Sequence, residues 1–128
     1  MRWVITVAAI SGASAVIIGA LSAHAEAGMN DIQIGWMDTA LRYQTWNTIG
    51  LLAIGVLGQV WKPTMILKAS ATALIAGMLF FSGSLYVMAT TSFQDLGVVT
   101  PLGGLCLIAG WLLLALASLT GRSKQNQV

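Results

Sequence analysis

The sequence predicts an all-α membrane protein, a four-helix bundle with a short interfacial helix between its first two helices. Two observations lead to this fold class. Of the 128 residues, 57% are hydrophobic and only 8% are charged, whereas soluble domains carry about 25% charged residues. The charged residues also leave four long uncharged intervals, each close to or above the roughly 20 residues that a membrane-spanning helix needs. An ordinary soluble domain, a disordered chain and a coiled coil are therefore excluded.

The uncharged intervals place the four helices within a single integral membrane domain that covers residues 1–128. We expect helices at about residues 3–24, 43–61, 63–91 and 101–120. Helices are expected because lipid cannot satisfy the free hydrogen-bonding edge of an open sheet.

The first helix has to be distinguished from a secretory signal peptide. Met1 and Arg2, the apolar run and the segment Ala23-His24-Ala25 resemble the three parts of such a signal. The apolar run is, however, longer than the 7–15 or so residues of a typical signal. We therefore expect a retained first helix.

The loop over residues 25–42 contains an amphipathic pattern. Asn30 and Gln33 have the spacing of a capping box, which predicts a helix start. Asp38 and Arg42 are spaced as an i,i+4 ion pair. A shared apolar face is formed by Ile34, Met37 and Leu41. This pattern predicts a short helix lying at the membrane interface, before the second span.

The last two helices have start signals. Pro63 suits the first helical position, where its missing N–H costs nothing. Thr100, followed by Pro101, suits the N-cap of the fourth helix, which Gly121 would end. Small residues such as Gly103 recur on the helix faces and would let helices approach closely within the chain.

Charge asymmetry predicts the orientation in the membrane. Five of the six basic residues fall at one end of the predicted bundle: Arg2, Lys62, Lys68, Arg122 and Lys124. All four acidic residues fall at the other end, together with Arg42: Glu26, Asp31, Asp38 and Asp95. Because basic residues favour the cytoplasmic side, both termini are expected in the cytoplasm and the 25–42 loop outside it.

Polar side chains from all four predicted helices share the extracytoplasmic half of the membrane. Candidate ligand-binding residues are His24, Tyr43, Gln44, Asn47, Ser82, Ser84, Tyr86 and Thr100. The favoured interpretation is a satisfied hydrogen-bond network, in which His24 joins Tyr43 or Tyr86. The alternative is a pocket for a lipid headgroup or small polar ligand, which would open on the acidic side between the first three helices.

Several motifs resemble one family. They are G-A-L-S-A-H-A at 19–25, Trp36 to Gln44 as W-x-x-T-x-x-x-Y-Q, F-S-G-S-L-Y at 81–86, T-P-L-G-G at 100–104 and Gly110-Trp111. The chain resembles the family called domain of unknown function 423, whose eukaryotic relatives are called transmembrane protein 256. The resemblance implies four helices in a bacterial inner membrane or a mitochondrial-type membrane, and no assigned activity. Where that family commonly has a second histidine this chain has Asn47, which argues against a role needing two histidines.

The residue types also limit the classes of function that the protein can have. A single histidine, the absence of a carboxylate within any span and one cysteine favour no catalytic group, no metal site and no cofactor. A net charge of +2 is too small for nucleic-acid binding. We expect an accessory, scaffold or lipid-interacting component, with membrane lipid as a partner and a homo-oligomer or larger membrane complex left open. An oligomeric small-solute transporter or pore is the alternative, and a membrane enzyme the third choice.

Overall fold

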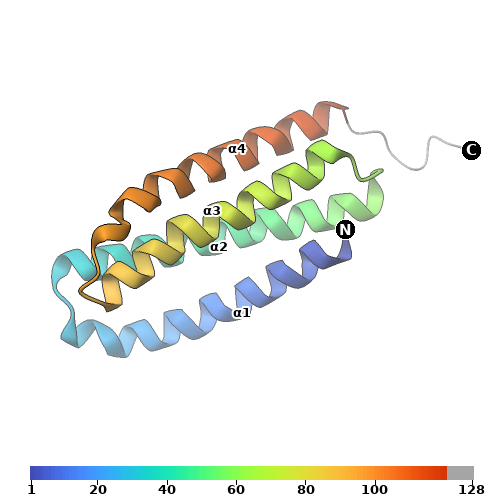
Figure 1. The fold of residues 1–128 in the computed structure, drawn as a ribbon. Coiled ribbons are helices and arrows are strands. Elements are labelled where there is room, and N and C mark those ends of the chain that lie inside the picture. Colours follow the sequence, from blue (N-terminus) through green and yellow to red (C-terminus); the bar gives the residue numbers. More distant parts are fainter. Residues whose placement is uncertain (121–128) are drawn as a thin grey trace, which may run out of the picture.

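The computed structural model describes residues 1–120, which form four α-helices joined by short connections (Figure 1). The helices are α1 (Arg2–Ala25), α2 (Asp31–Val60), α3 (Met65–Thr90) and α4 (Val99–Thr120). Two 3₁₀ turns, η1 (Glu26–Gly28) and η2 (Asp95–Val98), lie in the connections after α1 and α3. The predicted all-α membrane bundle is confirmed. The predicted end at Gly121 lies outside the described residues.

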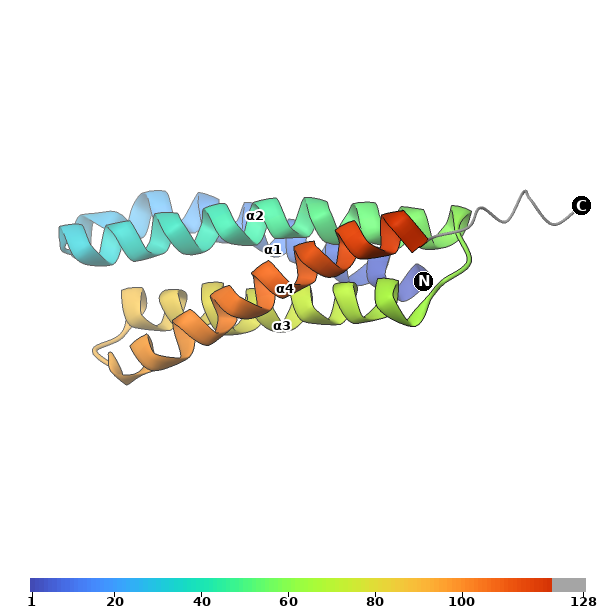
Figure 2. The same cartoon turned by 90° about the horizontal axis from the view of Figure 1, so that it is seen from above.

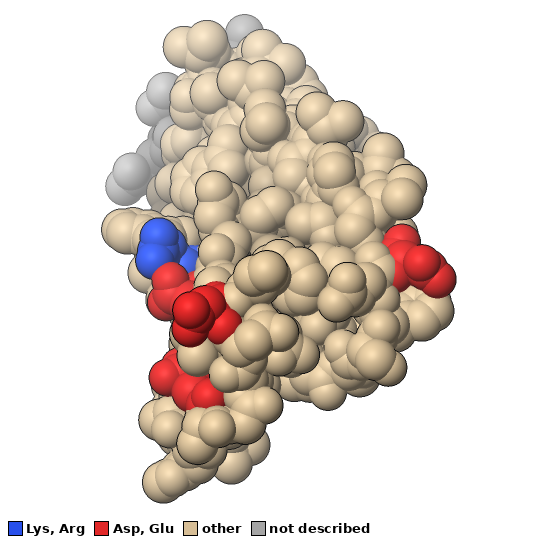
Figure 3. Space-filling model, turned by 90° about the vertical axis from the view of Figure 1, so that its left-hand side faces the viewer, with Lys and Arg blue, Asp and Glu red and all other residues tan. Residues whose placement is uncertain are grey.

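The helices alternate in direction, so the connections gather at two ends (Figure 1). The N-terminus, the α2–α3 connection and the last turn of α4 lie at one end, which we call the terminal end. The α1–α2 and α3–α4 connections lie at the other, which we call the acidic end. Figure 3 looks onto the acidic end and shows acidic side chains on it, with blue Lys or Arg atoms beside only one group of them.

The helices form two layers, α1 with α2 and α3 with α4 (Figure 2). Extensive helix contacts join α1 to α2, α2 to α3 and α3 to α4, whereas α1 and α3 barely touch. The main apolar core lies toward the terminal end and contains fully buried Val4, Leu51, Ile54 and Leu74. Because α1 packs mainly against α2, space remains between α1 and α3.

The layer of α3 and α4 depends on glycines at the crossing. A Cβ added to Gly77 would lie 2.5 Å from Cδ2 of Leu107, and one added to Gly110 would lie 2.5 Å from Cδ2 of Leu74. At Gly103 an added Cβ would collide with the backbone of Phe80 and Phe81. The predicted close packing of small residues therefore operates between helices of the same chain.

The expectation of a separate interfacial helix is wrong, because α2 runs without a break from Asp31 to Val60. Its predicted start is confirmed: Asn30 Oδ1 accepts a hydrogen bond from the Gln33 amide at 2.9 Å, and Gln33 Oε1 accepts one from the Asn30 amide at 3.0 Å. The polar residues at 42–44 mark the start of the uncharged interval, but none of them is a helix-breaking proline. The helix therefore continues through them for about 45 Å, beyond the roughly 30 Å of a hydrocarbon core.

The predicted helix starts shift slightly for similar reasons. Thr64 is the N-cap of α3, with its hydroxyl accepting from the Leu67 amide at 3.1 Å, so Pro63 precedes the cap instead of opening the helix. Thr100 lies inside α4 and is not its N-cap, because η2 leads directly into the helix at Val99. The Thr100 hydroxyl donates back to the Leu96 carbonyl at 3.3 Å.

Three segments of the described chain are long and apolar enough to cross a membrane: Arg2–Gly28, Met65–Thr90 and Asp95–Thr120. The α2 helix is longer but less apolar, because it begins with charged residues and carries Gln44 and Asn47 in its middle. Both of these side chains are buried between helices, at 8% and 3% exposed. The least apolar helix thus lies where its neighbours cover its polar atoms.

Candidate functional site

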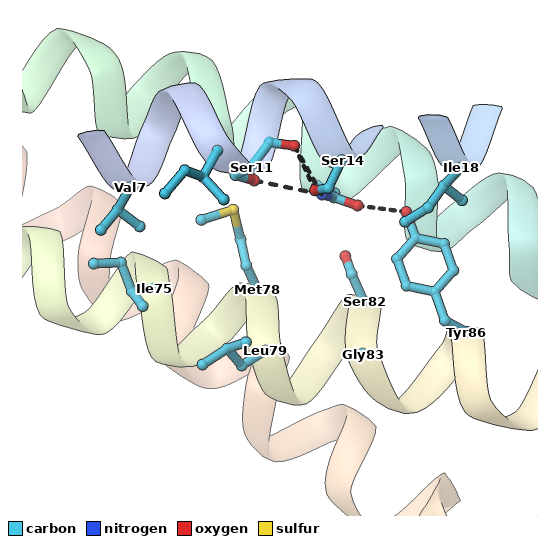
Figure 4. A pocket seen from close by; sticks show the side chains of 12 residues that line it. Val7, Ser11, Ser14, Ile18, Ile75, Met78, Leu79, Ser82, Gly83 and Tyr86 are labelled. Carbon is cyan, nitrogen blue, oxygen red and sulfur yellow. Dashed lines mark hydrogen bonds between the residues drawn. The ribbon is translucent and has the colours of Figure 1, made fainter. Parts of the chain in front are cut away.

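A cavity of about 300 Å³ lies between α1 and α3, with α2 at its base (Figure 4). We call it the α1–α3 groove. It is lined by Val7, Ile10, Ser11, Ser14 and Ile18 of α1, Gln44 of α2, and Ile75, Met78, Leu79, Ser82, Gly83 and Tyr86 of α3. It exists because both α1 and α3 pack against α2 and barely against each other.

The base of the groove is crossed by a hydrogen-bond network centred on Gln44 (Figure 4). The Gln44 amide nitrogen donates to the Ser14 hydroxyl at 2.8 Å and to the Ser11 carbonyl at 3.0 Å. The Gln44 amide oxygen accepts from the Tyr86 hydroxyl at 2.6 Å. The hydroxyls of Ser11 and Thr48 pair at 2.6 Å. These five residues, which we call the Gln44 network, connect α1, α2 and α3.

The Gln44 network is neutral and internally satisfied. Among the described residues, no buried side-chain nitrogen or oxygen lacks a hydrogen-bond partner. The surface that the groove exposes is almost entirely apolar. A polar ligand would therefore have to displace existing hydrogen bonds, whereas a hydrocarbon chain would not.

Three further polar links join helices outside the Gln44 network. The Ser82 hydroxyl donates to the Ala40 carbonyl of α2 at 2.8 Å. The Trp111 indole N–H of α4 donates to the Asn47 side-chain oxygen of α2 at 2.9 Å. The hydroxyls of Ser84 and Thr100 pair at 2.6 Å between α3 and α4. Each link satisfies polar atoms that would otherwise be costly to bury.

The eight candidate residues predicted from sequence therefore do not form one cluster. Gln44 and Tyr86 share the Gln44 network, and Ser82 lines the same groove. The remaining polar links are distributed over other helix pairs. Tyr43 packs its ring against Phe81 with centroids 4.5 Å apart.

His24 is separate from all of these groups. It is exposed in the last turn of α1, and no hydrogen bond or ion pair within residues 1–120 involves its imidazole. The expected link to Tyr43 or Tyr86 is therefore wrong. Ser22 is the buried residue of this turn, and two residues further on, about 200° around the helix, His24 points away from the bundle.

The depth predicted for the polar residues also changes. Gln44 lies near the middle of α2, and Ser11 and Ser14 lie near the middle of α1. The sequence prediction placed Gln44 in the extracytoplasmic half of the membrane because it began the second helix at residue 43. Since α2 begins at Asp31, the network lies near mid-height of the bundle.

Sequence reasoning missed Ser11, Ser14 and Thr48 as members of the network. A usable signal existed. Ser11 and Ser14 are three residues apart and Gln44 and Thr48 four apart, so each pair lies on one face of its helix. Two polar faces on consecutive antiparallel helices are well placed to pair.

The described residues contain no group of three or more His, Cys, Asp or Glu side chains that could hold a metal ion. Cys106 is half-buried in α4. The groove therefore offers a ligand apolar walls and polar groups that are already hydrogen-bonded to one another.

The chain is similar to one family of membrane proteins. The family described as "Protein of unknown function (DUF423)" matches residues 18–104. The chain is 34% identical to the UPF0382 inner membrane protein YgdD of Escherichia coli, over 96% of this chain and 94% of that protein. It is 35% identical to a UPF0382 membrane protein of Staphylococcus haemolyticus, over 92% and 96%, and 32% identical to one of Haemophilus influenzae, over 93% and 95%. No solved structure matches the chain significantly.

Proposed function

Because this chain belongs to the DUF423 family of proteins of unknown function, we propose that it is a lipid-interacting protein of the bacterial inner membrane. In this proposal it acts as an accessory or scaffold component and catalyses no reaction. The similarity to relatives named inner membrane proteins supports the location. The observation that carries the proposal is the α1–α3 groove, which would hold one hydrocarbon chain of a membrane lipid.

The shape and chemistry of the groove support a lipid chain as its occupant. Two residues of its walls, Ile10 and Leu79, are 66% and 67% exposed, so the groove opens sideways. In a membrane this opening faces acyl chains. A volume of about 300 Å³ lies at the lower limit of small-molecule sites, and its apolar walls suit part of one hydrocarbon chain better than a polar headgroup.

The polar base of the groove supports the same occupant. Its donors and acceptors pair with one another, so an incoming ligand gains little by offering hydrogen bonds. Close packing against Ile75 and Leu79 would supply the affinity. We propose that the Gln44 network joins the helices while the groove beside it binds lipid.

The proposed orientation places both termini in the cytoplasm. It follows from the basic residues Arg2, Lys62 and Lys68 at the terminal end and the four acidic residues at the other. Positively charged loops favour the cytoplasmic side of a membrane.

Filling the groove tests the proposal. Gly83 lines the groove, and a Cβ added there meets no other group within 4 Å. In Gly83→Leu the new side chain should occupy the space of the lipid chain, while leucine also favours helix more than glycine does. We expect the variant to fold and to lose most of its copurified lipid, measured by native mass spectrometry after mild extraction.

Gly35→Leu is the matched control. A Cβ at Gly35 also meets nothing within 4 Å, and Gly35 lies outside the groove near the start of α2. This variant should keep the lipid of the unmodified protein. Equal lipid retention by Gly83→Leu and Gly35→Leu would show that the groove does not bind lipid.

A further inference from the structure

We infer that the groove selects an anionic phospholipid from the leaflet at the terminal end, with its headgroup beside Lys68. This inference rests on the proposed lipid-binding function and adds the class of lipid and the leaflet. It follows from the direction of the groove, the position of Lys68 and the distribution of charge along the bundle.

The groove runs parallel to the bundle. On α3 it begins at Ile75, toward the terminal end, and extends to Tyr86, toward the acidic end (Figure 4). Lys68 precedes Ile75 by seven residues, which is about two helical turns and about 10 Å along the axis. Lys68 therefore lies on the face of α3 that lines the groove, between the groove and the terminal end.

The Lys68 side chain is free to meet a headgroup. It is exposed in the first turns of α3, and no ion pair within the described chain engages it. Helical side chains tilt toward the N-terminus of their helix, which for α3 is the terminal end. A long lysine side chain can extend its ammonium group in that direction to the level of the headgroups.

Charge decides which leaflet supplies the lipid. At the terminal end, the charged side chains of the described residues are the cations Arg2, Lys62 and Lys68. At the acidic end a headgroup would meet four carboxylates, and Arg42, the only lysine or arginine there among the described residues, already pairs with Asp38 at 2.5 Å. Basic residues near a membrane surface attract anionic headgroups, so the groove should take its lipid from the terminal end.

A competition between two lipids tests the inference. The protein is reconstituted with equimolar phosphatidylglycerol and phosphatidylethanolamine, and the ratio of the two bound lipids is measured by native mass spectrometry. We expect the unmodified protein to bind more phosphatidylglycerol. Lys68→Gln should bring the ratio close to one without reducing total bound lipid, and Lys68→Arg should keep the preference.

Arg42→Gln is the matched control, because it removes the same charge from the exposed acidic end. It should leave the preference unchanged. A preference that survives Lys68→Gln, or one that Arg42→Gln abolishes equally, would overturn the inference about the headgroup. The separate result that Gly83→Leu retains its lipid would overturn the proposed function itself.

Discussion

At the scale of single residues, Gln44 is the most consequential side chain. A buried primary amide is costly unless its donors and acceptor are satisfied. Here Ser11 and Ser14 on one helix and Tyr86 on another satisfy it. One side chain of α2 thereby holds two helices that barely touch each other.

The hydrogen bond from Tyr86 to Gln44 should contribute measurably to stability. In Tyr86→Phe the Gln44 oxygen keeps its burial and loses its partner, so we expect unfolding to become easier by about 1 kcal/mol. Thermal or denaturant unfolding in detergent measures the change.

Tyr43→Phe is the control for Tyr86→Phe, because it removes a hydroxyl from the same type of residue. The Tyr43 ring packs on Phe81, but its hydroxyl makes no hydrogen bond within the described residues. This variant should unfold like the unmodified protein. If both variants lose the same stability, the bond to Gln44 is not the cause.

At the scale of elements, α3 and α4 cross where glycines let their backbones lie close together. Ser70 strengthens the same contact, since its hydroxyl donates to the Gly110 carbonyl at 2.7 Å. In lipid, helix pairs gain little from the hydrophobic effect. Close packing at small residues and hydrogen bonds of this kind therefore hold the layer together.

A methyl group at Gly103 should separate α3 from α4. Its Cβ would collide with the backbone of Phe80 and Phe81, which cannot rotate away as a side chain can. We expect Gly103→Ala to destabilise the protein by about 1–3 kcal/mol, measured by unfolding in detergent.

The neighbouring Gly104→Ala is the control for that experiment. Its Cβ would lie 3.7 Å from the Phe81 ring, an ordinary contact, so stability should not fall. Equal losses in the two alanine variants would contradict the assignment of the helix crossing to Gly103.

At the scale of the whole molecule, the acidic side chains and the main apolar core lie toward opposite ends of the bundle. Carboxylates gather at one end (Figure 3), whereas the apolar core lies toward the other. The Gln44 network lies between them. The charge distribution predicts orientation, and the packing leaves the groove as the opening between two layers.

Reporter fusions test the proposed orientation. A cytoplasm-active fluorescent reporter at the C-terminus should be active, because the terminal end carries the basic residues. A periplasm-active phosphatase fused after Gln94, at the acidic end, should also be active. A phosphatase that works at the C-terminus would show the opposite orientation.

The sequence by itself determined the helical membrane fold, the order of the helices and the capping box at Asn30. These depend on composition and on spacing along one chain, which the sequence displays directly. It did not determine that α2 is continuous, because a change in hydropathy at residues 42–44 marks a change of surroundings and leaves the backbone helical.

Only the tertiary structure decided which polar residues meet. The sequence predicted that eight candidates share one region. The rotation of each helix instead places Gln44 and Tyr86 in one network, pairs Ser84 with Thr100 and leaves His24 at the surface. A polar residue can be assigned a depth from its position in the chain. Its partner depends on which helices are neighbours and how they are turned, and those are fixed by packing between residues far apart in sequence.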